Sequence, residues 1–278
     1  MKQLSIHGLE FSIFDEGDGP PLLFVHGFPL DHTMWRGQLA EFATAYRVIA
    51  PDLRGFGASG IGEAAVTMEQ FADDLAAILD TLGVREPVAL VGLSMGGYVA
   101  WQFVRKYRCR LRALVLCDTK AAADSPEAAE SRLKVAETVL ADGTEALARA
   151  MVPKLFAKRT IENRSPVVEA VRKVILQCNR QGVAAAQRGM AARPDVTDML
   201  ATIDVPTLVI VGEDDVISPP EEMRRIAQAI PGSRLVAIPK AGHLAPLENP
   251  AAFNAALGEF LAAVEGRRAP YYTSRGRE

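Results

Sequence analysis

The sequence predicts an α/β protein with a mostly parallel, doubly wound sheet, and three observations indicate this fold class. Short apolar runs of strand length alternate with segments of helical pattern, an order typical of a sheet with helices on both faces. The runs are almost continuously apolar, which indicates strands buried on both sides. At 278 residues, 49% of them apolar, the chain is long enough to bury one large core.

We expect eight strands. The first two follow one another closely and indicate an N-terminal antiparallel pair, Leu4–His7 and Phe11–Asp15. The other six are Leu22–His26, Tyr46–Asp52, Val88–Gly92, Ala113–Cys117, Thr207–Gly212 and Leu235–Ile238. Four helices alternate with them, at Thr67–Leu82, Gly97–Tyr107, Glu221–Ile230 and Pro250–Val264.

The interval from Thr119 to Ala201 contains no convincing strand. Its pattern predicts four helices, at Pro126–Leu140, Thr144–Phe156, Val167–Asn179 and Val183–Ala192. We therefore expect an α/β core formed by residues 1–118 and 202–265, and a helical cap of residues 119–201 inserted after the sixth strand. A flexible basic tail is expected at residues 266–278, because chain ends with many charges and few apolar residues rarely order.

Charge and composition exclude several classes of protein. A net charge of −3 argues against a nucleic-acid binder, which would show a concentrated basic face. No apolar run approaches the about 18 residues of a transmembrane helix, and the N-terminus lacks a signal-peptide pattern. The three cysteines are too widely spaced for a disulfide framework or a zinc knuckle. We expect a cytoplasmic protein with no metal site and no membrane partner.

The strongest chemical motif runs from Gly92 to Gly97, with the sequence GLSMGG, between a strand and a helix. A strand-to-helix turn this sharp strains its central residue and exposes the side chain of Ser94 at the carboxyl edge of the sheet. Small residues are needed on both sides of the serine because a Cβ there would meet neighbouring backbone. This pattern predicts that Ser94 is a catalytic nucleophile.

A serine nucleophile needs a base and an acid that orients the base. Of the four histidines, His243 lies in the loop after the last strand, where it can reach Ser94, and histidine has a suitable pKa near 6.5. The loop after strand Thr207–Gly212 supplies Asp215 as the expected acid. Asp214 is the first alternative, and Asp118, after strand Ala113–Cys117, is the second.

The oxyanion formed in acyl transfer needs hydrogen-bond donors. We expect them to be the backbone N–H groups of Met95, next to the nucleophile, and Phe28, in the loop after the third strand. An apolar pocket is expected nearby. Its candidate residues follow the oxyanion loop or lie in the cap helices: Leu30, Met34, Trp35, Met151, Leu155, Phe156 and Met190.

A second glycine motif has the spacing of a dinucleotide-binding site. The segment Gly55–Gly60 matches GxGxxG after a strand, but a dinucleotide site needs a helix that opens directly at the glycines. Here the next helix begins only near Thr67. We expect instead that Asp52, just before the glycines, is a buried polar anchor for this loop. No cofactor is expected.

Together these motifs resemble the α/β-hydrolase fold superfamily, in its small serine esterase and 3-oxoadipate enol-lactonase branch. The resemblance covers residues 1 to about 264. The motifs that carry it are His26–Pro29, Asp52–Ser59, Gly92–Gly97, Gly212–Asp215 and Gly242-His243. In that family the acid stands three positions after the strand-ending glycine, which favours Asp215. The resemblance implies a helical lid at the strand-free interval and no cofactor.

The expected function is hydrolysis of a small carboxylic ester or lactone through an acyl-enzyme, with Ser94, Asp215 and His243 as the catalytic triad. Alternatives on the same fold are an enol-lactonase or a C–C bond hydrolase, a perhydrolase or acyltransferase, and a non-catalytic ligand sensor. Dehalogenases and epoxide hydrolases of this fold use an aspartate nucleophile, and Ser94 stands in its place. A homodimer is compatible with the sequence.

Overall fold

The computed structural model describes residues 1–163 and 166–266, and the eight expected strands are confirmed. The strands are β1 (Lys2–Ile6), β2 (Leu9–Glu16), β3 (Pro21–Val25), β4 (Arg47–Pro51), β5 (Val88–Leu93), β6 (Leu111–Cys117), β7 (Thr207–Gly212) and β8 (Arg234–Ile238). They form one sheet in the order β1-β2-β4-β3-β5-β6-β7-β8. Only β2 runs against the others, so the sheet is parallel from β4 to β8.

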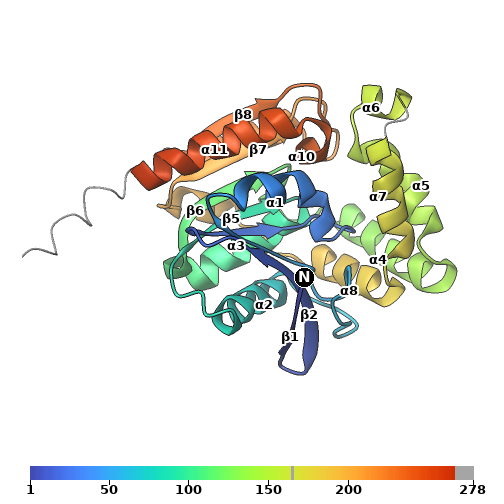
Figure 1. The fold of residues 1–278 in the computed structure, drawn as a ribbon. Helices are drawn as coiled ribbons and strands as arrows, with labels where there is room; N and C mark the ends of the chain where they lie inside the picture. The colour runs from blue at the N-terminus through green and yellow to red at the C-terminus, as the bar shows by residue number, and fades with distance from the viewer. Residues whose placement is uncertain (164–165, 267–278) are drawn as a thin grey trace, which may run out of the picture.

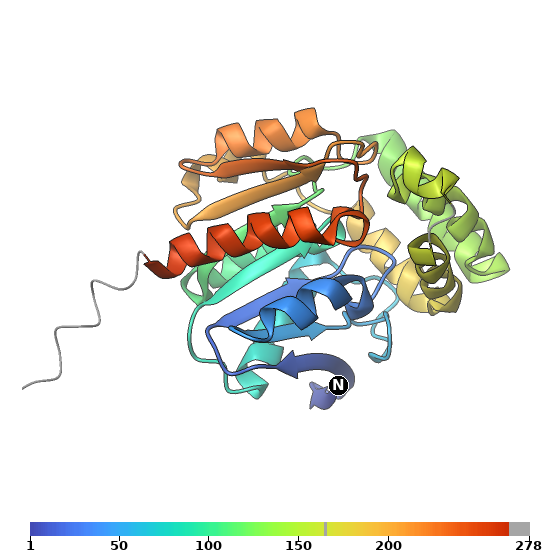
Figure 2. The same cartoon turned by 45° about the horizontal axis from the view of Figure 1, so that its top comes forward.

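Helices cover both faces of the sheet, as a doubly wound fold requires. On one face lie α1 (Arg36–Phe42) and α11 (Pro250–Gly266), which contact each other. On the other face lie α2 (Met68–Thr81), α3 (Met95–Tyr107) and α9 (Pro220–Ala229). Figures 1 and 2 show the sheet between these two layers. Strands β3, β5, β6 and β7 are buried along their whole length, which explains their continuous apolar sequences.

A group of helices between β6 and β7 gathers at one end of the sheet, on the right in both views (Figures 1 and 2). They are α4 (Pro126–Asp142), α5 (Glu145–Leu155), α6 (Lys158–Glu162), α7 (Pro166–Gln177) and α8 (Arg180–Ala191). We call these five the cap helices. Of the basic tail expected at residues 266–278, Gly266 ends α11 and the rest lies outside the described residues.

Several short helical segments were not expected from the sequence. They include α1, α6 and α10 (Ala245–Glu248), with seven, five and four residues. Short 3₁₀ segments occur at His32–Trp35, Arg108–Arg110 and Thr197–Thr202. Segments of one or two turns do not display enough of a 3.6-residue period to be recognised. Among the described residues, no helix combines the length and the hydropathy that crossing a membrane would require.

Cap helix α8 lies directly on the backbone of the loop between β4 and α2. A Cβ at Gly182 would stand 2.0 Å from the carbonyl oxygen of Gly55, and a Cβ at Gly189 would stand 1.7 Å from that of Val66. The two helix glycines are seven residues apart and therefore lie on one face of α8. Of the glycines in the GxGxxG match, Gly55 thus serves close packing between the loop and the cap.

This close approach predicts opposite effects for two helical glycines. Gly189→Ala should lower the free energy of unfolding by about 1–3 kcal/mol, because the methyl group meets rigid backbone. Gly258→Ala in α11 is the matched control. Its Cβ would lie 3.8 Å from Phe42, so the higher helix propensity of alanine should stabilise the protein by up to about 1 kcal/mol. Urea unfolding of both variants checks this, and equal effects would contradict the packing described.

Candidate active site

The four expected chemical groups come from four neighbouring strands. Ser94 follows β5, Asp118 follows β6, Asp215 follows β7, and His243 lies in the loop after β8. Because these strands are parallel and adjacent, their carboxyl ends meet at one edge of the sheet, where open α/β sheets bind ligands. The topology therefore places all four residues at the same edge.

Ser94 occupies the strained turn that the sequence predicted. Its backbone has φ 54° and ψ −113°, and α3 begins at the next residue. Three donors hold its carbonyl oxygen: the amides of Gly97 and Tyr98, at 2.9 and 3.2 Å, and the hydroxyl of Thr119, at 2.8 Å. Its own amide donates to Cys117 O at 2.9 Å. Strain of this kind persists only where surrounding contacts fix it, and the side chain stays partly exposed.

Glycines bring the nucleophile turn close to the end of β3. A Cβ at Gly96 would stand 2.3 Å from the carbonyl oxygen of Val25, and one at Gly92 would stand 2.4 Å from that of Gly96. A Cβ at Gly27 would stand 3.4 Å from the Cβ of Ser94. The loop after β3 therefore lies against the nucleophile.

The two expected oxyanion donors are both unengaged amides. Phe28 follows Gly27 in the loop beside Ser94, and Met95 is the first residue of α3, where a helix leaves its N–H groups without intrahelical partners. Within residues 1–163 and 166–266, the structure shows no protein acceptor for the amide of Phe28 or of Met95. Two free donors next to a serine can stabilise a negatively charged oxygen.

His243 contacts Asp215 and is nearly buried with it. The Nδ1 atom of His243 lies 2.8 Å from Oδ2 of Asp215, and the two residues are 2% and 3% exposed. The other carboxylate oxygen of Asp215 accepts the amides of Ile217 and Ser218, at 2.7 and 3.1 Å. These contacts fix the carboxylate and keep the proton of the neutral imidazole on Nδ1, which leaves Nε2 free to act as a base.

The two alternative acids lie in different surroundings. Asp214 is exposed, and its amide donates to Ala241 O at 2.8 Å. Asp118 is fully buried, and its Oδ1 accepts the amide of Gly212 at 2.8 Å. Burial, with the nearby charge of Asp215, raises the pKa of Asp118 well above its ordinary value. Of the three aspartates, Asp215 is the one within hydrogen-bond distance of His243.

The loop that carries His243 is attached to the cap helices. Glu248 of α10 accepts the amide of Gly242 at 2.6 Å and, from the cap side, the amide of Ala157 at 2.9 Å and the hydroxyl of Thr160. The amide of Leu244 donates to Leu155 O at 3.1 Å. The position of the imidazole therefore depends on α5 and α6.

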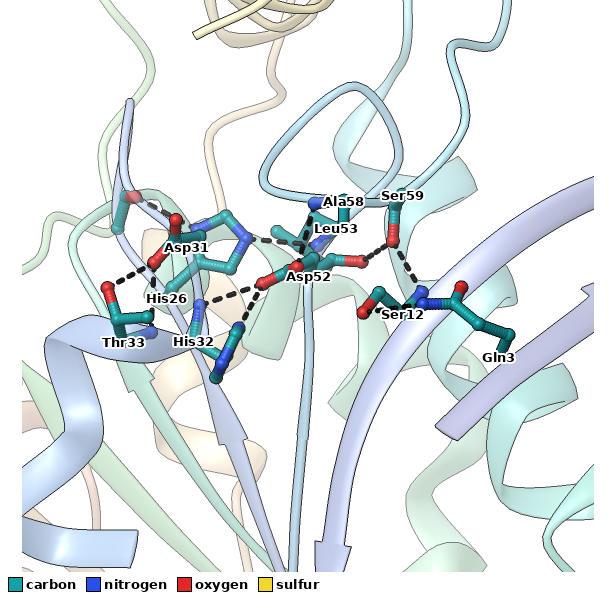
Figure 3. Close-up of polar contacts among 11 residues, drawn as sticks. Gln3, Ser12, His26, Asp31, His32, Thr33, Asp52, Leu53, Ala58 and Ser59 are labelled. Atoms are coloured by element: carbon teal, nitrogen blue, oxygen red, sulfur yellow. Dashed lines mark hydrogen bonds and ion pairs between the residues drawn. The ribbon is translucent and has the colours of Figure 1, made fainter. Parts of the chain in front are cut away.

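A second polar network anchors the loop that carries Phe28 (Figure 3). The amide of Leu53 donates to Nε2 of His26 at 3.0 Å, so the ring proton sits on Nδ1 and is donated to Gly27 O. Asp52 accepts both the amide and the Nδ1 proton of His32, at 3.0 and 2.6 Å. Asp52 is 1% exposed and also accepts the amide of Ala58 at 3.0 Å, so it is the buried polar anchor expected for the glycine loop.

The charges of this network follow from its geometry. Burial lowers the pKa of His26, which favours the neutral ring. Burial alone would lower the pKa of His32 too, but the hydrogen bond and charge of Asp52 outweigh it and raise that pKa. Burial likewise opposes ionisation of Asp52, but the hydrogen bonds from His32 and Ala58 lower its pKa. Each partner therefore favours the charged form of the other, and the two form an ion pair when the His32 ring is protonated.

Within the described part of the chain, two groups have three metal-type ligand atoms within 4.8 Å of one another: Asp31, His32 and Asp52, and Asp118, Asp215 and His243. In each group the carboxylates already accept backbone amides or a ring N–H. The described geometry is that of hydrogen-bond networks, and no contact in either group requires a cation.

The candidate pocket residues lie in different surroundings. Trp35 lies in the hydrophobic core, with ring centroids 5.0 Å from Phe24 and 6.0 Å from Phe253, so we reassign it to packing. Leu30 is also buried and Met151 is partly buried. Phe156 lines a cavity of about 830 Å³ between α5, α6 and the loop of Asp214 and Asp215.

Thr119 and Glu248 support Ser94 and the His243 loop, and neither was predicted from the sequence to have a role in the site. Thr119 is the second residue after β6, and Glu248 stands five residues after His243. Their positions at strand and loop ends were visible, but their partners come from distant segments.

Comparison with known proteins agrees with this architecture. The family model of the alpha/beta hydrolase fold matches residues 20–250. Among curated proteins, the chain is 28% identical to 3-oxoadipate enol-lactonase 2 of Acinetobacter baylyi over 90% of this chain and 91% of that protein.

Two solved structures are also similar to this chain. The malate-bound structure of a thermophilic esterase from Thermogutta terrifontis has 49% identity and a TM-score of 0.93, and covers 95% of this chain and 99% of that one. An enol-lactonase from Burkholderia xenovorans LB400 has 29% identity and a TM-score of 0.86, and covers 94% of this chain and all of that one.

The pair of His32 and Asp52 predicts a loss of stability at alkaline pH. The raised pKa of His32 means that the folded state holds its proton more tightly than the unfolded state, where the pKa is near 6.5. The stabilisation is therefore complete below about pH 6.5 and is lost as the pH rises through the raised folded value. We expect the free energy of unfolding of the wild type to exceed that of His32→Gln by more at pH 6 than at pH 9. Urea titrations at both pH values measure this, and a gap independent of pH would rule out the ion pair.

Proposed function

The chain belongs to the α/β hydrolase fold family, and we propose that it is a serine-dependent hydrolase of small carboxylic esters or lactones. The observation that carries this proposal is the 2.8 Å contact between the buried pair His243 and Asp215, at the same sheet edge as the strained Ser94. Likeness to an esterase and to enol-lactonases supports the substrate class.

In the proposed mechanism Ser94 Oγ attacks the carbonyl carbon of the substrate, and His243 Nε2 takes the hydroxyl proton. The carbonyl electron pair moves onto oxygen, where the amides of Phe28 and Met95 would stabilise the charge. Collapse of this intermediate breaks the ester bond, and His243 gives its proton to the departing alcohol. A water molecule, deprotonated by His243, then releases the acid and restores Ser94.

Asp215 would act through His243 in both halves of this cycle. Its Oδ2 holds the imidazole by Nδ1, and its negative charge stabilises the imidazolium that forms when Nε2 is protonated. Because Oδ1 is occupied by two backbone amides, the carboxylate cannot turn away from the ring. The proposed acid is therefore held in one orientation.

We assign residues 119–201 the role of a cap over this site. Residues of this interval contact both loops: Leu155 and Ala157 reach the loop of His243, and Cys178 donates to Pro29 O in the loop of Phe28 at 2.9 Å. A cover of this kind excludes water and shapes the acyl pocket.

Hydrolysis of p-nitrophenyl esters with acyl chains from C2 to C12, together with simple lactones, tests the proposal. We expect Ser94→Ala to lower turnover by about 10⁴-fold or more, since a triad acts as a unit. Equal activity of the wild type and Ser94→Ala would overturn the serine mechanism. Turnover of lactones but not of esters would narrow the substrate class.

The identity of the triad acid can be tested by substituting each of two neighbouring aspartates. Asp215→Asn should lower kcat by about 10⁴-fold, because an amide at that position favours the wrong histidine tautomer. Asp214→Asn is the matched control. Its side chain is exposed, and we expect kcat within about twofold of wild type, as for surface substitutions in general. The reverse pattern would assign the role to Asp214.

A further inference from the structure

Asp118 is a buried carboxyl group that the proposed reaction leaves without a role. It lies at the end of β6 with φ 46°, a backbone conformation that non-glycine residues rarely adopt. Its Oδ1 accepts the amide of Gly212, but its Oδ2 is buried and has no donor among the described residues. A buried carboxylate oxygen without a donor is costly.

The groups that face Asp118 are acidic. One oxygen each of Asp118 and Asp215 and a ring nitrogen of His243 all lie within 4.8 Å of one another. Glu248 of α10 adds a further negative charge, and the neighbouring thiol of Cys117 is buried and has a raised pKa. Burial and the nearby carboxyl groups of Asp215 and Glu248 raise the pKa of Asp118, whereas the hydrogen bond from Gly212 lowers it.

Two carboxylates this close, in a buried site, do not both ionise. Asp215 has three donors, from Ile217, Ser218 and His243, which stabilise its negative charge. Asp118 has one donor, from Gly212. The proton therefore belongs on Asp118.

We propose that Asp118 is protonated and donates its proton in a hydrogen bond to Asp215, which makes it a positioning residue for the carboxylate that holds His243. The bond gives the orphaned oxygen a partner and gives Asp215 a fourth donor. The pair then carries a single negative charge. This inference rests on the proposed function only for its effect on catalysis, since the location of the proton is a property of the folded protein.

The charge is tested first, without any assay of activity. Capillary electrophoresis at pH 7 compares the wild type with Asp118→Asn, which removes no charge if Asp118 is protonated. Asp214→Asn is the matched control, because it replaces an exposed carboxylate in the loop that follows the adjacent strand β7. We expect Asp118→Asn to migrate with the wild type and Asp214→Asn to migrate with one more positive charge. Equal migration of the two variants would overturn the proposal.

Positioning is tested by kinetics with two substitutions. Asparagine keeps an acceptor for Gly212 and offers an N–H to Asp215, so Asp118→Asn should keep kcat within about threefold of wild type. Asp118→Ala removes the donor and should lower kcat by about 10- to 100-fold with little change in KM. Thermal unfolding of both variants identifies any loss caused by misfolding.

The outcomes separate this inference from the proposed function. A wild-type kcat in folded Asp118→Ala would contradict the positioning role. If instead Ser94→Ala and the wild type are equally inert, the serine mechanism fails while electrophoresis still decides where the proton is. If Asp118→Asn loses as much kcat as Asp118→Ala, the neutral donor is not sufficient and the proposal is wrong.

Discussion

Contact between backbones without intervening side chains is the constraint on which the candidate site depends. At Gly92, Gly96 and Gly212 an added Cβ would lie within 2.4 Å of a carbonyl oxygen. These contacts draw the ends of β3, β5 and β7 and the loop of His243 together. Side chains that follow them in sequence are thereby brought into reach of one another, although their segments lie far apart along the chain.

Much of this arrangement could be predicted because its signals are local. Continuous apolar strands indicated the parallel sheet, and the strand, serine turn and helix around Ser94 placed the candidate nucleophile. Partners that arise from distant segments left no such signal. Nothing in the chain near Glu248 indicates that it accepts a hydrogen bond from Ala157 of the cap. Trp35 follows the loop of Phe28 and was therefore predicted to line the pocket, because its core partner Phe253 is over 200 residues away in the sequence.

The site also combines two buried polar systems that differ in charge. Around His243 the neighbours are carboxyl groups, so a proton must be retained within the group. Around Asp52 the hydrogen-bonded partner is the ring of His32, which carries the opposite charge when it is protonated. Each system fixes one loop of the candidate site. The low dielectric that makes unpaired groups costly there also makes the paired geometry rigid.

The attachment of the His243 loop to α5 and α6 bears on how such proteins diversify. Glu248 binds both the residue before His243 and the start of α6, so these few cap residues form part of the support for the imidazole. A cap exchanged with that of a relative would replace this support together with the pocket walls. Recombination that keeps residues 155–160 with the core, and exchanges only the rest of the cap, would change the substrate surface while preserving the position of His243.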